Sequence, residues 1–300
     1  MRTIAEIDAE TEFEELVEKK PWPQVVAKLA RRQPLGAFGF CIVVIMLLLS
    51  VFAEFVTVYD PELNAFEVML TPPGDKFFLG TDQFGRDVLT RIIFGARTAL
   101  LVGFSAAFMG ASAGLVLGVA SAYFGDTFDL LFQRVMDVFL AFPLIIMALA
   151  IVSIFGPGLE NVIIAITIPF IPQCARVVRS NALAIREIPY VDAARALGFG
   201  HARIILRHMV PNVMAPFLIM LSTFVGHAIL LEASLSYLGL GVQEPTPAWG
   251  LMLQGGAEEY AESAPWVAIW PGIAISLAVF GFNLFGDALR DALDPKLRQM

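Results

Sequence analysis

Residues 36–59 read GAFGFCIVVIMLLLSVFAEFVTVY, a run of apolar side chains with Glu54 as its only charged residue. Arg31 and Arg32 precede the run and Asp60 follows it, so charge marks both of its ends. A hydrocarbon core about 30 Å thick takes about 20 helical residues to cross. The run therefore predicts a first transmembrane helix. Because acidic residues precede it in the sequence, we expect no cleavable signal peptide.

Further apolar runs, each bounded by glycine, proline or charge, cover residues 98–124, 130–155, 159–178, 213–240 and 265–287. The whole chain is 57% hydrophobic and 16% charged, against roughly 45–50% and about 25% in soluble chains. We therefore predict an all-α integral membrane protein with six transmembrane helices. The fourth run is the least regular, since Pro169 and Pro172 interrupt it, but transmembrane helices tolerate proline where neighbours satisfy the freed backbone groups.

Lys and Arg are unevenly distributed among the connecting segments, and cytoplasmic segments are enriched in them. They are frequent in the tail before the first run and between the fourth and fifth runs, whereas residues 241–270 contain neither. We predict that both termini are cytoplasmic and that 241–270 faces outward. The predicted organisation is a cytoplasmic tail at 1–35, a first helix at 36–59, an external loop of mixed charge at 60–97 and a five-helix core at 98–300.

Small residues line one face of the second run, where Gly110, Gly114 and Gly118 occupy every fourth position. Another helix can approach such a face closely. The spacing favours packing inside this chain, and contact with a second membrane subunit is the alternative.

Ionisable residues inside spans are costly and often functional. Arg134 and Asp137 lie three positions apart on one helix face and can pair, which favours a structural role. Glu232 lies near the outer end of the fifth span, so we expect a gate or structural role for it. His227 is five positions away and does not share its face.

The segment 186–212 between the fourth and fifth runs contains YVDAARALG at 190–198. It predicts a helix, a turn at Gly198 and a second helix, because glycine allows a sharp reversal. The first helix offers a small apolar face made of Ala193, Ala194 and Leu197. Such an elbow suits docking into a groove on a partner, and a solvated loop is the alternative.

This segment resembles the signature loop of ABC importer permeases, which reads Glu-Ala-Ala, three residues, Gly, nine residues, Ile, one residue, Leu-Pro. Asp192 stands at the Glu position, one methylene shorter, and His208 and Val210 stand at the Ile and Leu positions. The matching positions are Ala193, Ala194, Gly198 and Pro211. His208 followed by an apolar residue and Pro-Asn is similar to the dipeptide, oligopeptide and nickel branch of the family.

Three further segments resemble that branch in the same order. Residues 80–97, with GTDQFGRDV and GAR, resemble its first external loop, residues 134–143 resemble its third span, and residues 232–250 resemble the end of its fifth. The resemblance extends from about residue 32 to the C-terminus.

The resemblance implies a type I ABC importer permease fold in the inner membrane and half of a translocation path for peptides or similar small solutes. It implies a second homologous permease subunit, two ATPase subunits and an external solute-binding protein as partners. It also implies coupling to the ATPase subunits through Asp192, Ala193, Ala194, Leu197, Gly198, Arg203, His208 and Pro211.

Several function classes lack their motifs. None of the five lysines follows a glycine, so the chain has no Walker A phosphate loop, and we expect ATP to bind partner subunits and no cofactor to bind this one. The three histidines form no HExxH and there is no GxSxG, so we expect no catalytic or metal site. A net charge of −8 does not suggest nucleic acid. A secondary transporter or channel is the main alternative, although we find no inverted repeat.

Overall fold

The computed structural model describes residues 33–293, and its regular structure in that range is helical apart from one bridge between Thr81 and Asp87. Five helices are long and apolar enough to cross a membrane, and a pair of bent helices makes a sixth span when the two are counted together. The five are α3 (Pro34–Val51), α5 (Val88–Phe124), α8 (Leu159–Arg186), α11 (Met214–Tyr237), extended by the helical residues 201–213, and α13 (Trp266–Leu293). The prediction of a six-span helical membrane protein is confirmed.

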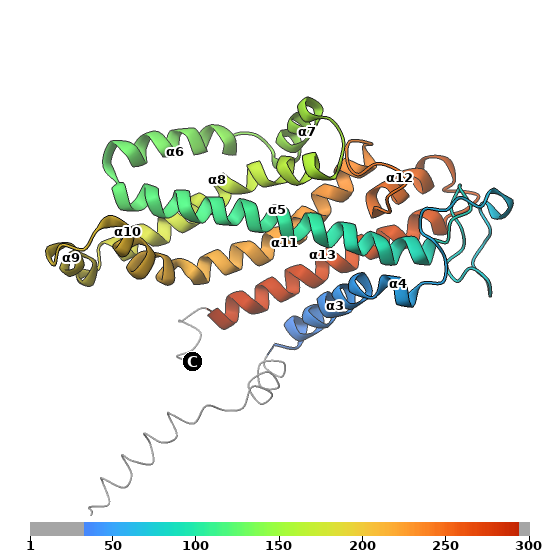
Figure 1. Cartoon of the computed structure of the whole chain (residues 1–300), viewed down its shortest axis with the longest axis horizontal. Helices are drawn as coiled ribbons and strands as arrows, with labels where there is room; N and C mark the ends of the chain where they lie inside the picture. The colour runs from blue at the N-terminus through green and yellow to red at the C-terminus, as the bar shows by residue number, and fades with distance from the viewer. Residues whose placement is uncertain (1–32, 294–300) are drawn as a thin grey trace, which may run out of the picture.

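Short elements lie at the two ends of the bundle, as Figure 1 shows. At one end are α9 (Pro189–Ala196) and α10 (His201–Ile204). At the other end are α4 (Ala53–Val56), the loop of residues 57–87 with its single 3-10 turn, and α12 (Trp249–Glu259). The long helices run between these ends, so each end can act on the other only through them.

Two boundaries differ from the sequence prediction. α3 ends at Val51 and α5 begins at Val88, ten residues before the predicted span. The early start has a local cause, because the Asp87 side chain caps the helix by accepting a hydrogen bond from the backbone N–H of Thr90 at 2.8 Å. The loop predicted at 60–97 therefore covers 57–87, and its last ten residues belong to a helix.

The third and fourth spans also differ from expectation. The third is not one helix but α6 (Asp126–Leu140) followed by α7 (Leu144–Phe155), bent by 87°. Pro143 lies at the bend, where its missing N–H and fixed φ interrupt a helix. Pro169 and Pro172 by contrast lie inside α8, which stays continuous. Both prolines are buried, and α5 packs against this part of α8.

The core forms where α5 contacts α8 and α11. The glycine face of α5 lies on α8 inside this chain: Cβ atoms built on Gly110 and Gly114 would come within 2.7 Å of the Phe170 Cβ and 2.5 Å of the Cys174 Cβ. Any larger side chain would separate the helices. Phe170 of α8 stacks on Phe224 of α11 with ring centroids 4.2 Å apart. Gly118 extends the same contact, since its Cβ would lie 2.6 Å from the Ala175 carbonyl oxygen.

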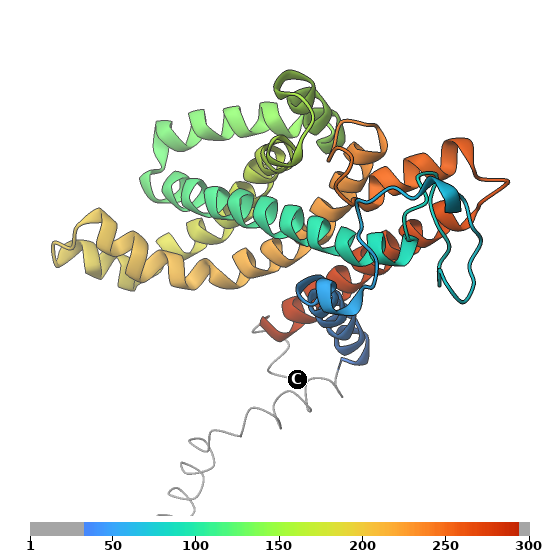
Figure 2. The same cartoon turned by 45° about the vertical axis from the view of Figure 1, so that its right-hand side comes forward.

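The remaining helices flank this core. Figures 1 and 2 show α3 and α13 side by side on one side of it and α6 and α7 on the other. Apolar side chains are exposed along α3, including Ile45 and Leu48 at 56% and 51%, which suits contact with lipid. Residues 1–32 and 294–300, which include most of the predicted N-terminal tail, lie outside the described residues.

Candidate functional site

The segment of residues 186–212, here called the elbow, reverses direction at Gly198. This glycine has a φ of +76°, and no heavy atom lies within 4 Å of the place that a Cβ would occupy. Glycine is therefore required by backbone conformation and not by lack of space. The turn is closed by the N–H of Phe199, which donates to the Ala194 carbonyl at 3.1 Å.

The three residues predicted to share one apolar face of α9 are divided between two faces. Ala194 is buried together with Val191, whereas Ala193 is exposed and Leu197 has 73% of its surface exposed. Residues 193 and 197 are four positions apart and so lie on one side, while 194 is rotated by about 100°. The outward face of α9 consists of Ala193 and Leu197, with Asp192 beside them in an exposed ion pair to Arg195 at 3.4 Å.

The second half of the elbow holds α9 in place. The Tyr190 hydroxyl donates to the His208 carbonyl at 3.0 Å, and the Asn212 side-chain amide donates to both groups, at 3.0 and 2.7 Å. The His208 ring stacks on the Phe199 ring. The Arg203 guanidinium lies over the same Phe199 ring, 4.1 Å from its centroid. These contacts make the elbow a stiff unit.

The helix that leaves the elbow continues into α11 through one π-helical turn, Ile205–Met209, and one 3-10 turn, Val210–Val213. Pro211 lies in the second of these turns, where its missing N–H cannot complete an α-helical bond. The helical run from His201 to Tyr237 is nonetheless unbroken.

The elbow also contacts the end of α5. The Tyr123 hydroxyl lies 2.7 Å from the His201 Nδ1, and the Arg195 guanidinium lies over the Tyr123 ring at 5.3 Å. Arg186 donates to the Ala122 carbonyl at 2.9 Å. The elbow is therefore in contact with α5 as well as continuous with α11.

The ionisable residues predicted inside spans have different partners. Arg134 and Asp137 form an exposed ion pair of 3.8 Å, and Asp137 makes a closer contact with Arg176 of α8. Glu232 is almost fully buried, with 1% of its surface exposed. It accepts a hydrogen bond from the Ser236 hydroxyl at 2.7 Å, and that hydroxyl accepts from the N–H of Val242 at 3.1 Å. Glu232 thereby stabilises the chain reversal that follows α11.

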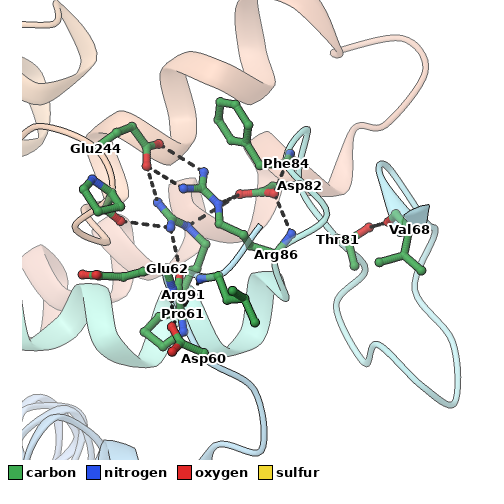
Figure 3. Close-up of polar contacts among 12 residues, drawn as sticks. Asp60, Pro61, Glu62, Val68, Thr81, Asp82, Phe84, Arg86, Arg91 and Glu244 are labelled. Carbon is green, nitrogen blue, oxygen red and sulfur yellow. Dashed lines mark hydrogen bonds and ion pairs between the residues drawn. The ribbon is translucent and has the colours of Figure 1, made fainter. Parts of the chain in front are cut away.

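A second site was not predicted. Asp82, Arg86, Arg91 and Glu244, here called the charge cluster, lie together at the opposite end of the bundle from the elbow. Figure 3 shows both guanidinium groups between the two carboxylates. Arg86 donates to Asp82 at 2.7 Å and to the two Glu244 oxygens at 2.5 and 3.1 Å. The fork of the guanidinium thus matches the carboxylate in two-point geometry.

Arg91 is the innermost member of the charge cluster, with none of its surface exposed. Its Nη1 donates to the carbonyls of Pro61 and Pro245 at 2.7 and 3.3 Å, and its other nitrogens lie 3.7 Å from Asp82 and 3.5 Å from Glu244.

Burial lowers the pKa of Arg86, but its hydrogen bond to Glu244 and the nearby charge of Asp82 outweigh this, and the pKa is raised above its ordinary value. Arg86 therefore remains cationic.

Sequence reasoning missed this pairing because Arg86 and Glu244 are 158 positions apart. One signal was available. Several arginines lie in a loop predicted to be external, although Lys and Arg are usually enriched on the cytoplasmic side. Such arginines would be expected to pair with nearby acidic side chains. Asp82 four positions before Arg86 was the nearest candidate.

The chain combines a bundle of membrane-spanning helices with one exposed helical elbow, and its sequence has no phosphate loop. This combination is typical of a membrane subunit of an ATP-driven importer. Residues 114–299 match the family described as binding-protein-dependent transport system inner membrane component, and residues 20–73 match the N-terminal TM domain of oligopeptide transport permease C. The chain belongs to the first of these families. It is a non-catalytic permease subunit of an ABC importer, located in the inner membrane as a multi-pass protein.

Related permease sequences match nearly the whole chain. A peptide transport system permease protein of Brucella suis is 42% identical over 93% of this chain and 94% of its own length. The dipeptide transport system permease protein DppC of Alkalihalophilus pseudofirmus is 42% identical over 93% and 91%, and the glutathione transport system permease protein GsiD of Escherichia coli is 39% identical over 93% and 92%. The importer prediction is confirmed over the secondary transporter or channel.

The fold has a solved counterpart. An inward-facing structure of the MetNI methionine ABC transporter aligns with a TM-score of 0.55 at 20% identity, covering 68% of this chain and 96% of the other. This similarity confirms the type I permease fold.

Proposed function

We propose that this subunit forms half of the translocation path of an importer for peptides or similar small solutes, and that the elbow couples it to two separate ATPase subunits. The solute class is supported by the names of the relatives, which specify peptide, dipeptide and glutathione. ATP binds the partners, and this subunit binds no cofactor.

The observation that carries the coupling role is the exposed outward face of α9. Leu197 leaves 73% of its surface exposed at the tip of the bundle, and Gly198 beside it has open space around it. A stiff turn that presents an apolar side chain with most of its surface uncovered suits insertion into a groove on another protein. Because the following helix runs unbroken into α11, displacement of α9 would move the span as a rigid body.

The orientation follows from this role. The elbow end faces the cytoplasm, where the ATPase subunits are, and both chain termini lie on that side. The opposite end, with the charge cluster, faces outward and receives a solute-binding protein. A second, homologous permease subunit completes the path. The excess of arginine around the elbow and its absence from 241–270 support this orientation.

The proposal is tested by expressing this chain with its companion permease and ATPase subunits and measuring ATP-dependent uptake into proteoliposomes. The associated binding protein supplies labelled dipeptides, longer peptides or glutathione in parallel. We expect uptake of at least one peptide class and co-purification of the ATPase subunits. Co-purification that survives replacement of residues 190–198 by a glycine–serine linker would show that the elbow is not the docking element.

A further inference from the structure

The charge cluster joins two segments that are distant in sequence. Asp82 and Arg86 belong to the 57–87 loop, whereas Glu244 belongs to the connection between α11 and α12. Arg91 lies in the first turn of α5, between the two segments, and contacts both through carbonyl groups and carboxylates. Two cations face two anions, so the formal charges of the cluster balance. Arg91 Nε and Nη2 are buried and form no hydrogen bond among the described residues, so they interact with the two carboxylates through charge alone.

Additional hydrogen bonds fix the α11–α12 connection to α5. The Trp249 indole donates to the Ile92 carbonyl at 2.9 Å, and the Thr98 hydroxyl donates to the Pro247 carbonyl at 2.8 Å. A Cβ on Gly95 would lie 2.6 Å from the Trp249 ring, so the two elements are in direct contact. On the other side, the Trp266 indole at the start of α13 donates to the Thr81 carbonyl at 3.1 Å.

The same two helices link the charge cluster to the elbow. α5 carries Arg91 in its first turn and Tyr123, which contacts His201 of the elbow, in its last. α11 continues from the elbow at its beginning and leads into the connection that holds Glu244 at its end. The two helices are thus joined at both ends, once by the elbow and once by the charge cluster.

We infer that Arg91 and Glu244 are positioning residues for transport: they hold the 57–87 loop, the α11–α12 connection and the start of α5 as one rigid block. With the block intact, a displacement begun at the elbow moves the opposite ends of α5 and α11 together. When these contacts are weakened, the loops deform instead of transmitting the displacement, and the translocation path does not change shape. The inference rests on the proposed function in that the elbow receives the ATP-driven movement.

Two variants test this role with little change in volume. Glu244→Gln removes one charge at a side chain that is 39% exposed and borders a cavity of about 470 Å³, where water can solvate the change. Arg91→Lys keeps the charge but cannot contact two carbonyls and two carboxylates at once. The matched control is Glu258→Gln, which alters an exposed residue lining the same cavity with no ion pair among the described residues.

The variants are measured in the complete importer. Relative to wild type, Glu244→Gln and Arg91→Lys should lower solute uptake by about tenfold or more while assembly and ATP hydrolysis in the absence of binding protein stay within about twofold. Glu258→Gln should match wild type. Normal uptake in both variants would overturn the inference. So would loss of assembly in both, which would make the charge cluster a folding element only.

A second measurement is independent of transport. Hydrogen–deuterium exchange of the purified subunit should rise in both variants at the amides of Asp82 and Val88, which donate to the carbonyls of Arg86 and Gly80 at 3.0 Å each. Unchanged exchange would contradict the rigid block. If exchange rises as expected but the wild-type importer takes up no peptide, the block stands and the proposed solute class fails.

Discussion

The elbow and the charge cluster connect the same two helices at opposite ends but are built in opposite ways. The elbow is exposed: Leu197 and Leu206 leave 73% and 66% of their surfaces uncovered. The charge cluster is mostly buried: Arg91 has no exposed surface, only Glu244 is partly exposed, at 39%, and each carboxylate lies within 4 Å of both arginines. An exposed apolar surface is available to another protein, whereas charged groups that pair with one another act within their own chain.

Mutations should therefore act differently at the two ends. At the elbow, changes to exposed side chains should alter partner binding and leave folding intact. At the charge cluster, changes should alter the rigidity or stability of this chain and leave partner binding intact. Matched substitutions at the two ends test this difference.

The largest effect is expected for Gly198→Pro. The glycine has a φ of +76°, and proline is confined to about −65°, so the reversal after α9 cannot form. Transport should fall below detection while the protein still inserts into the membrane, as measured by uptake and by membrane fractionation. The control is Gly200→Ala, because Gly200 has a φ of −66° and free space for a Cβ. Normal transport by the proline variant would show that the elbow does not transmit movement.

The next largest effect is expected for Leu197→Asp. A charge on the outward face of α9 would be desolvated in an apolar groove, so the affinity for the ATPase subunits should fall by about tenfold or more. Co-purification with the ATPase subunits measures this. The same substitution at Leu63, which is 70% exposed in the 57–87 loop, is the control and should leave ATPase binding unchanged. Equal losses at both positions would argue against a specific docking face.

A moderate effect on stability is expected for Asp82→Asn. Asp82 accepts hydrogen bonds from the N–H groups of Phe84 and Arg86 and pairs with the Arg86 side chain, all in a buried position. Loss of its charge should lower the free energy of unfolding by about 1–3 kcal/mol, seen as a lower thermal midpoint in detergent. Asp192→Asn, at an exposed elbow residue, should change the midpoint little. A larger loss at Asp192 would reverse the comparison.

The smallest effect is expected for Tyr123→Phe, which removes the hydroxyl that contacts His201 and keeps the ring beneath Arg195. One hydrogen bond contributes about 1 kcal/mol, so uptake should fall by only about two- to fivefold. Tyr59→Phe removes a comparable hydroxyl contact, to the Lys76 carbonyl at 2.9 Å, at the other end and serves as control. An uptake equal to wild type would remove Tyr123 from the connection between the elbow and α5.

Prediction from the sequence succeeded where the cause is local. The position of the elbow follows from a glycine between two helical segments, and the structure has its turn at Gly198. Prediction failed where the cause is remote. Ala194 was grouped with Leu197, but which side of α9 is buried depends on the helix beneath it. The predicted pair of Arg134 and Asp137 is present at 3.8 Å, but the closer partner of that aspartate, Arg176, comes from another span and was not predicted.

The number of apolar runs and the family follow from the sequence alone, because the length of an apolar run and the spacing of a motif are properties of neighbouring residues. Whether a proline interrupts a span depends on tertiary packing: Pro143 lies at the bend between α6 and α7, whereas Pro169 lies inside α8, against which α5 packs. The tertiary structure also decided the charge cluster. Arg91 and Glu244 meet because two folded segments place them together, and a buried charge is stable only when such a partner is present.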